Sequence, residues 1–228
     1  MVEISRRLSV RVSIALFALA ALACGESETP QSPSASELEN IDLNVRVHLL
    51  QSSELEPLNS TLSDSELDVL LVGVNEAWKQ AGITWRLESV VREPAQNAEG
   101  YAEVLRGVAP ATTELLSSIF PKENLLGGEW DVFIVKDLGD IAGGVYLQSL
   151  GVVIFAEFGV AGAQTPTGAG RRILAHELGH SLGLAHVPCT LEGNLMAPGC
   201  PSEDRTRLEA QQVQAARQQA RRGRPFGL

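Results

Sequence analysis

Three of the four histidines fall in one stretch, HELGHSLGLAH, which covers residues 176–186. Residues four apart lie one above the other on a helix face, so a helix here presents His176 and His180 on the same side. Gly183 allows that helix to end, because glycine adopts the left-handed conformation that terminates helices without a steric penalty. The reversal lets His186 approach from another direction. The stretch therefore predicts a helix, a sharp stop and a turn that brings three imidazoles together.

This arrangement predicts a zinc site with an open position. Three neutral imidazoles on Zn²⁺ leave a fourth position for water, as expected of a catalytic rather than a structural site. Zinc lowers the pKa of that water to about 7, so Glu177 at the edge of the same helix face is placed to take its proton. A lone His-Glu-x-x-His pattern also arises by chance on apolar helices. The added Gly183 and His186 favour zinc over that alternative.

The stretch resembles the H-E-x-x-H-x-x-G-x-x-H signature of the metzincin zinc peptidases at every fixed position. Asn-Leu-Met-Ala-Pro at residues 194–198 resembles the methionine turn of that family, with Met196 beneath the zinc. A short helix expected over residues 207–213 resembles the last helix of matrixin-type members. The resemblance implies a metalloendopeptidase with one catalytic Zn²⁺ held by His176, His180 and His186, and with Glu177 as the base.

The match is specific only over residues 176–198, and no tyrosine follows Met196. The tyrosine that astacin-like members use as a ligand or donor therefore has no counterpart. The resemblance implies that residues 198–204 form a wall of the pocket for the residue after the scissile bond. Nothing in the sequence fixes the depth or polarity of that pocket.

Hydrophobic periodicity predicts an α/β frame for this site. Residues 45–50 alternate as a strand, a Ser63–Glu66 capping box starts a helix that runs to Gly82, and residues 83–87 alternate again. Such a strand-helix-strand unit predicts parallel pairing. A helix is expected at residues 112–120, and strands are expected at residues 130–135, 143–147 and 151–156.

We expect a metzincin-like α+β fold with a twisted, mostly parallel five-stranded sheet, one antiparallel edge strand, an active-site helix and a C-terminal helix. In metzincins the antiparallel strand lies above the cleft. The resemblance implies that Gly144, Val145 and Tyr146 pair their backbone with an extended peptide substrate. A short, protected sheet edge without a binding role is the alternative.

The amino-terminal residues predict export. Three arginines precede an apolar run at residues 12–23, which is too short to span a bilayer, since a span takes about 20 residues. Residues 21–24, Ala-Leu-Ala-Cys, resemble the lipobox of bacterial lipoproteins, which makes Cys24 the lipidated residue. Ordinary cleavage that releases a secreted protein is the alternative. Gly25 and Glu26 after the cysteine favour sorting to the outer membrane.

The chain then divides into a signal peptide at residues 1–23, a lipidated disordered tether at residues 24–40 and a catalytic domain at residues 41–228. The tether is rich in Ser, Pro and Glu, and such a composition buries too little apolar surface to fold. The hydrophobic content of 44% is sufficient for one core. We expect a monomer that is anchored to the bacterial envelope through its lipid.

Cys189 and Cys200 bracket Met196, and in an oxidising compartment they should form a disulfide. A metal site is the poorer alternative, because two thiols form an incomplete ligand set. Calcium is compatible with Asp137 and Asp140, but two carboxylates are too few to predict a site. His48 lies on the first strand, far from the zinc motif, and is interpreted as structural.

The formal net charge of −10 argues against nucleic-acid binding, which requires a basic face. Two other functions remain open beside an endopeptidase. The domain could be a non-catalytic surface lipoprotein in which the metal only stabilises the fold, although Glu177 is then without a use. It could also be a zinc amidase that cleaves peptide cross-links of the cell wall, because the same chemistry serves both reactions.

Overall fold

The expected sheet is present in the computed structural model, which describes residues 38–157, 169–198 and 205–228. The predicted signal peptide, Cys24 and the tether up to residue 37 lie outside the described residues and stay predictions. None of the described helices has the length and hydropathy that a membrane crossing requires.

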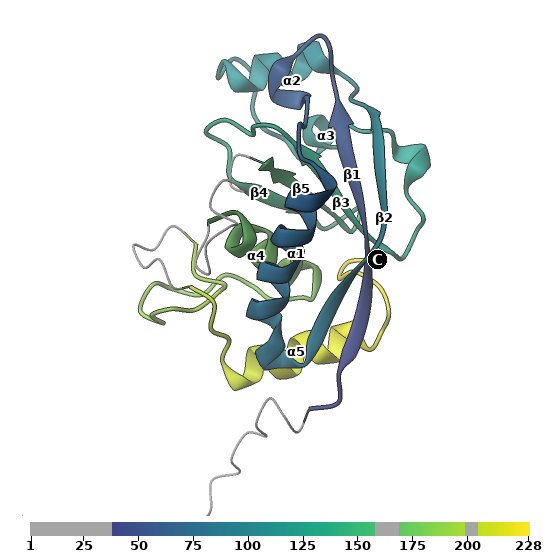
Figure 1. The fold of residues 1–228 in the computed structure, drawn as a ribbon. Helices are drawn as coiled ribbons and strands as arrows, with labels where there is room; N and C mark the ends of the chain where they lie inside the picture. Colours follow the sequence, from purple (N-terminus) through teal and green to yellow (C-terminus); the bar gives the residue numbers. More distant parts are fainter. Residues whose placement is uncertain (1–37, 158–168, 199–204) are drawn as a thin grey trace, which may run out of the picture. The chain divides into compact units, whose positions relative to one another are not determined.

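Five strands form one sheet in the order β2-β1-β3-β5-β4 (Figure 1). Their pairing is parallel except between β4 and β5, which run antiparallel. The short strand β4 therefore lies at one edge, as predicted. The strands are β1 (Ile41–Gln51), β2 (Ile83–Pro94), β3 (Trp130–Val135), β4 (Gly144–Leu147) and β5 (Val152–Ala156).

The connection between β1 and β2 follows the predicted strand-helix-strand unit. Ser63 caps helix α1 (Asp64–Trp78), and Glu66 returns its side chain to the Ser63 backbone N–H, which completes the capping box. A 3-10 turn follows α1, and Gly82 ends it with a φ of 57°. Because the helix returns the chain to the start of the sheet, β2 pairs parallel with β1.

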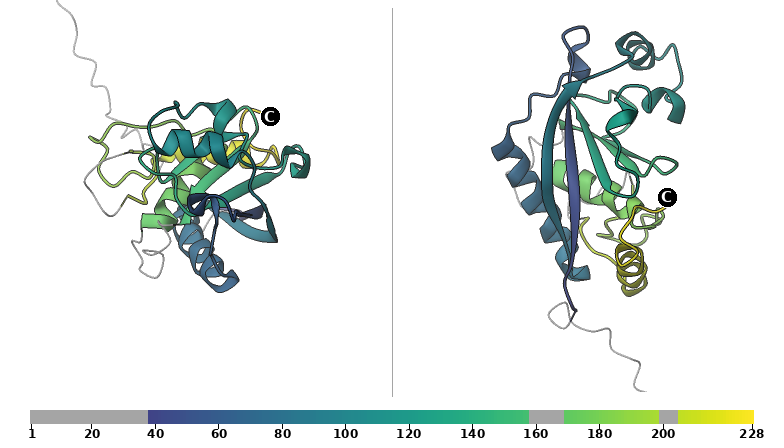
Figure 2. Two further views of the ribbon diagram at one scale, coloured as in Figure 1. Left: turned by 90° about the horizontal axis from the view of Figure 1, so that it is seen from above. Right: turned by 90° about the vertical axis from the view of Figure 1, so that its right-hand side faces the viewer.

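Two hydrophobic clusters cover opposite faces of the sheet because successive strand residues point to opposite sides. The first cluster contains side chains of α1, α4 (Ala169–Ser181) and α5 (Ala210–Ala220). The second contains side chains of α2 (Ala98–Leu105) and α3 (Thr113–Leu116). Figure 2 shows α1 and α2 on opposite sides of β1.

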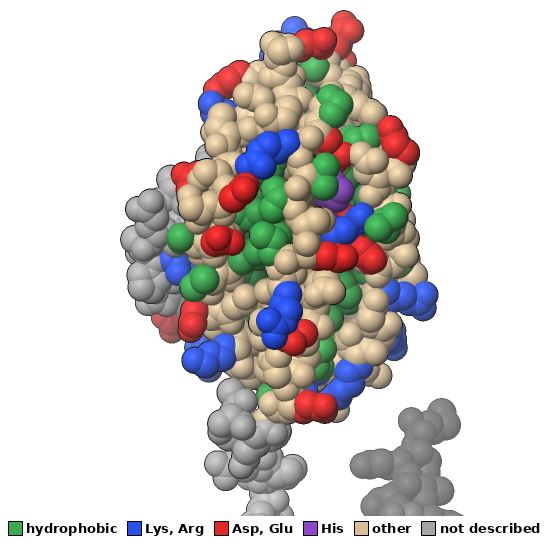
Figure 3. Space-filling model, turned by 45° about the vertical axis from the view of Figure 1, so that its right-hand side comes forward, with side chains coloured by type: hydrophobic (Ala, Val, Ile, Leu, Met, Phe, Trp, Pro, Cys, Tyr) green, Lys and Arg blue, Asp and Glu red, His purple; other side chains and the backbone are tan. Residues whose placement is uncertain are grey.

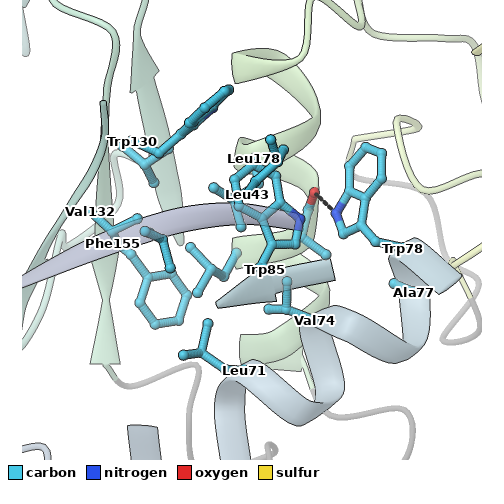
Figure 4. Packing of buried hydrophobic residues seen from close by; sticks show 14 of the residues in the cluster. Leu43, Leu71, Val74, Ala77, Trp78, Trp85, Trp130, Val132, Phe155 and Leu178 are labelled. Carbon is cyan, nitrogen blue, oxygen red and sulfur yellow. Dashed lines mark hydrogen bonds between the residues drawn. The ribbon is translucent and has the colours of Figure 1, made fainter. Parts of the chain in front are cut away.

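Three tryptophans fill the first cluster between the sheet and the helices (Figure 4). Trp85 of β2 lies edge-to-face with both Trp78 and Trp130, at ring-centroid distances of 6.4 and 5.8 Å. The indole N–H of Trp78 donates to the backbone carbonyl of Ala175 at 3.2 Å. This bond joins α1 to α4, the helix that carries the first two histidines of the motif.

Two helix predictions need correction. The helix expected at residues 112–120 spans only Thr113–Leu116, because Ser117 and Ser118 turn their hydroxyls back onto carbonyls three residues earlier. Helix α2 before it was not predicted.

The last helix begins at Ala210 rather than at residue 207. Arg207 cannot be helical because its backbone forms a β-bridge with Asn194, beside the turn that contains Met196.

Candidate metal centre and active site

Helix α4 ends at Ser181, and Gly183 reverses the chain just after it, as the sequence predicts. The Leu184 N–H donates to the Gly179 carbonyl at 3.0 Å, and the Gly183 N–H donates to the His180 carbonyl at 2.9 Å. Gly183 has a φ of 80°, which other residues rarely adopt. These two bonds form a Schellman motif, which satisfies the last carbonyls of the helix and reverses the chain toward His186.

The reversal brings the three histidines of the motif together. Their Nε2 atoms lie 3.1 Å (His176 to His180), 3.1 Å (His176 to His186) and 3.0 Å (His180 to His186) apart. Among the described residues, this trio forms a group whose ligand atoms could hold a metal ion.

Backbone carbonyls fix the orientation of two of the rings. His176 Nδ1 lies 2.7 Å from the Leu195 carbonyl, and His180 Nδ1 lies 2.7 Å from the Leu184 carbonyl. A carbonyl only accepts, so in the neutral ring each Nδ1 carries the proton and each Nε2 presents a lone pair. Two lone pairs that face each other at 3.1 Å have no proton to share, so this geometry suits a cation between them.

The electrostatic environment keeps these rings neutral. Burial, together with the neighbouring His180 and His186, lowers the pKa of His176 to about 4, although the hydrogen bond to the Leu195 carbonyl acts in the opposite direction. Burial also lowers the pKa of His180. Neutral imidazole is the form that binds metals.

The spacing of the nitrogens fits zinc. Nitrogen ligands about 2.0–2.1 Å from a tetrahedral Zn²⁺ are roughly 3.3–3.4 Å apart. The separations of 3.0–3.1 Å differ from that by a few tenths of an ångström. The set of three imidazoles therefore has the donor type and size that zinc requires.

Glu177 points from the same helix into the cleft beside the histidines. The residue is 7% exposed, and burial raises the pKa of its carboxyl to about 7, although a hydrogen bond from the Tyr146 backbone lowers it. Tyr146 belongs to β4, the predicted substrate strand. A Cβ on Gly144 of the same strand would lie 2.7 Å from Cγ of Glu177, so glycine is needed for the strand to approach this closely.

Met196 packs against Gly179 of α4. Its side chain is fully buried, and a Cβ on Gly179 would lie 2.6 Å from its sulfur. The Asn194 side chain accepts the Met196 N–H at 2.9 Å, and the Val187 N–H donates to the Met196 carbonyl at 3.0 Å. The turn thus supports the chain that follows His186, and its Leu195 carbonyl orients His176.

Two cavities adjoin the histidines, and Gly144 and Glu177 line both. The larger cavity, about 460 Å³, also contacts His180, His186 and the C-terminal Phe226. The smaller cavity, about 220 Å³, lies beside His176. Gly144 of the edge strand β4 and Glu177 thus lie at both cavities, which we together call the cleft.

His48 is buried in a separate polar cluster, consistent with a structural role. Its Nδ1 lies 2.9 Å from Glu93 and its Nε2 lies 3.1 Å from Asp131. Asp137, one of the two carboxylates compatible with calcium, accepts the Gly139 N–H at 2.7 Å.

Cys189 is described, but its predicted partner Cys200 lies outside the described residues, so the disulfide stays a prediction.

The sequence did not reveal several residues that build the site. The carbonyls of Leu184 and Leu195 orient two histidines, but a backbone acceptor leaves no trace in residue types. Gly144 and Gly179 were visible as glycines, yet only the packing shows what they accommodate.

The face shown in Figure 3 carries interspersed acidic and basic side chains rather than one sign of charge.

No protein-family model matches the sequence, and no curated protein matches it. Solved structures do match the fold. Mature mirolysin of Tannerella forsythia in complex with a cleaved peptide matches with a TM-score of 0.54 and 14% identity over 82% of this chain and 96% of that chain. Mirolysin in complex with compound 9 matches with a TM-score of 0.54 and 14% identity over 79% of this chain and 91% of that chain. The chain thus shares the fold of mirolysin.

Proposed function

We propose that this chain is a zinc-dependent endopeptidase of metzincin type. The observation that carries the proposal is the convergence of three Nε2 atoms within 3.1 Å, beside a buried carboxylate in a cleft that is bounded by a sheet edge. The shared fold with mirolysin, whose solved structure is a complex with a cleaved peptide, supports a peptidase function.

In this proposal His176, His180 and His186 hold the zinc. A zinc ion there supplies a Lewis acid, which polarises the scissile carbonyl and makes a water molecule more acidic. Glu177 accepts the proton from the attacking water and then donates it to the departing amine. A carboxyl whose pKa is raised toward neutrality suits both roles, because it can accept and release a proton near pH 7.

The peptide lies extended along β4 in this proposal. Within the described residues β4 pairs with β5 on one side only, so its other edge faces the cleft. Gly144, Val145 and Tyr146 line the larger cavity, where their backbone can bind an extended chain as an added strand. The Tyr146 N–H that binds Glu177 also holds the base against this strand.

The experiment compares the wild-type domain with Glu177→Ala and His186→Ala. Wild type should cleave casein, and a chelator should stop the cleavage. Glu177→Ala should keep one zinc per chain in elemental analysis but lose cleavage, whereas His186→Ala should lose zinc. A Glu177→Ala protein that still cleaves casein would refute the assigned role of this residue.

The same assay separates the two alternative functions. A domain that binds zinc but cleaves neither casein nor purified cell wall would be a metal-stabilised binding protein. Chelator-sensitive release of cell-wall peptides without casein cleavage would identify an amidase. No feature of the described cleft favours either one.

We further propose that the chain is lipidated at Cys24 and that Cys189 pairs with Cys200. Radiolabelled fatty acid should enter the wild-type chain and not Cys24→Ser. A peptide that joins residues 189 and 200 should appear in a non-reduced digest and disappear after reduction.

A further inference from the structure

The smaller cavity shares Gly144 and Glu177 with the larger one and also contacts His176. Its other described lining residues are apolar or glycine, except for two arginines, Arg172 of α4 and Arg205 after the methionine turn. At about 220 Å³ it is below the roughly 300–1,000 Å³ of pockets that take whole small molecules. A cavity of this size suits one side chain of a peptide that passes along β4.

Two arginines and one carboxyl, that of Glu177, are the charged groups among the described residues that line this cavity. Both guanidinium side chains line the same cavity. Burial lowers the pKa of Arg205, and the positive charge of Arg172 lowers it further. Arginine stays protonated despite such shifts. The described lining therefore keeps a net positive charge whether Glu177 is protonated or ionised, which favours an anionic side chain.

Arg205 also has hydrogen-bonding capacity to spare. One of its terminal nitrogens donates to the Ala197 carbonyl at 2.5 Å, which anchors the side chain to the methionine turn. Its Nε is buried and meets no acceptor within the described part of the chain. A buried donor without a partner is costly, so a ligand that brings an acceptor is favoured.

We propose that this arginine pocket, defined by Arg172, Arg205, Ile173, Leu195 and Pro198, selects an Asp or Glu side chain of the substrate next to the scissile bond. The inference rests on the proposed peptidase function. A carboxylate matches the fork of donors on a guanidinium, and the apolar lining strengthens the interaction by excluding water. Lysine and arginine side chains are rejected by like charge.

The overall acidity of the chain does not oppose this selection at short range. The net charge of −10 repels acidic proteins from a distance, but salt screens exposed charges beyond about 10 Å. Inside the pocket the arginines are nearer than that. The selection therefore concerns single acidic residues within a substrate rather than substrates of high negative charge.

The test is a cleavage-site profile of the zinc-loaded wild-type protein on a library of natural peptides. Asp and Glu should be enriched at one of the two positions that flank the cut bond. The enrichment is then quantified as the ratio of kcat/KM for two peptides that differ only by Glu or Gln at that position. We expect a ratio of about tenfold to hundredfold, the range of a hydrogen bond to a charged group.

Three variants make the test specific. Arg205→Gln should reduce the Glu/Gln ratio toward one, and Arg205→Glu should reverse the preference toward a Lys-containing peptide. Arg207→Gln is the matched control, because Arg207 is an exposed arginine two residues away that does not line the cavity, and its ratio should equal that of wild type. Thermal unfolding with zinc bound verifies that each variant is folded.

The outcomes separate this inference from the proposed function. Chelator-sensitive cleavage without acidic enrichment, or an enrichment that persists in Arg205→Gln, overturns the arginine pocket alone. A wild-type protein that cleaves no peptide in the library overturns the peptidase function and the pocket with it. Should Arg205→Gln fail to fold, Arg205→Glu and binding of the Glu and Gln peptides to Glu177→Ala give the same comparison.

Discussion

Glu177→Gln should stabilise the metal-free protein by an amount that grows with pH. Burial raises the pKa of Glu177 from 4.5 to about 7. The folded state therefore holds this proton more tightly than the unfolded state, so the stability that the proton confers is complete below about pH 4.5 and is lost as the pH rises through about 7. At about 1.4 kcal/mol per pKa unit, the loss amounts to about 3 kcal/mol once both states are ionised.

Glutamine keeps the shape of the side chain and can still accept the Tyr146 N–H, but it never ionises. The free energy of unfolding of the variant minus that of wild type should rise by about 2 kcal/mol between pH 5 and pH 8. Urea unfolding in the presence of a chelator, followed by tryptophan fluorescence, measures this difference. Bound zinc should reduce this difference in unfolding free energy, because a nearby cation favours the ionised carboxylate. A difference that does not change with pH would refute the reasoning.

Three further predictions concern close contacts around the site. Gly179→Ala should lower the free energy of unfolding by about 1–3 kcal/mol, because the new Cβ overlaps the Met196 sulfur, and Met196→Ala in the same chain should recover part of the loss in a urea titration. Gly144→Ala should reduce kcat/KM with zinc content unchanged, since the Cβ displaces Glu177; equal activity would show that the strand tolerates the atom. Trp78→Phe should cost about 1–3 kcal/mol in thermal unfolding, because the carbonyl bonded to its indole lies in the core.

Much of the fold follows from local patterns. The alternation at residues 45–50 and 83–87 predicts strands there, and the Ser63 capping box and Gly82 predict the two ends of the helical segment between them. The structure contains β1, α1 and β2 at these places. The prediction failed where distant contacts decide. The residues that follow Arg207 have a helix-forming pattern, and this pattern predicted that Arg207 is helical as well. The β-bridge between Arg207 and Asn194 holds Arg207 in an extended conformation instead.

The candidate site also has features that local patterns predict and features that depend on distant contacts. The histidine spacing and Gly183 predict the convergence of three imidazoles, because a helix turn and a Schellman ending are local events. The two arginines of the smaller cavity lie 33 positions apart in the sequence and meet only through folding. No local pattern marks such a pair, so the charge of the pocket could not be predicted.

The central claim is that His176, His180 and His186 together bind one catalytic zinc ion. Anomalous diffraction at the zinc absorption edge from crystals of the zinc-loaded domain tests it most directly. We expect one peak about 2.0–2.1 Å from each of the three Nε2 atoms and beside the Glu177 carboxylate. An absent peak at this position, or a zinc ion held by other residues, would contradict the account.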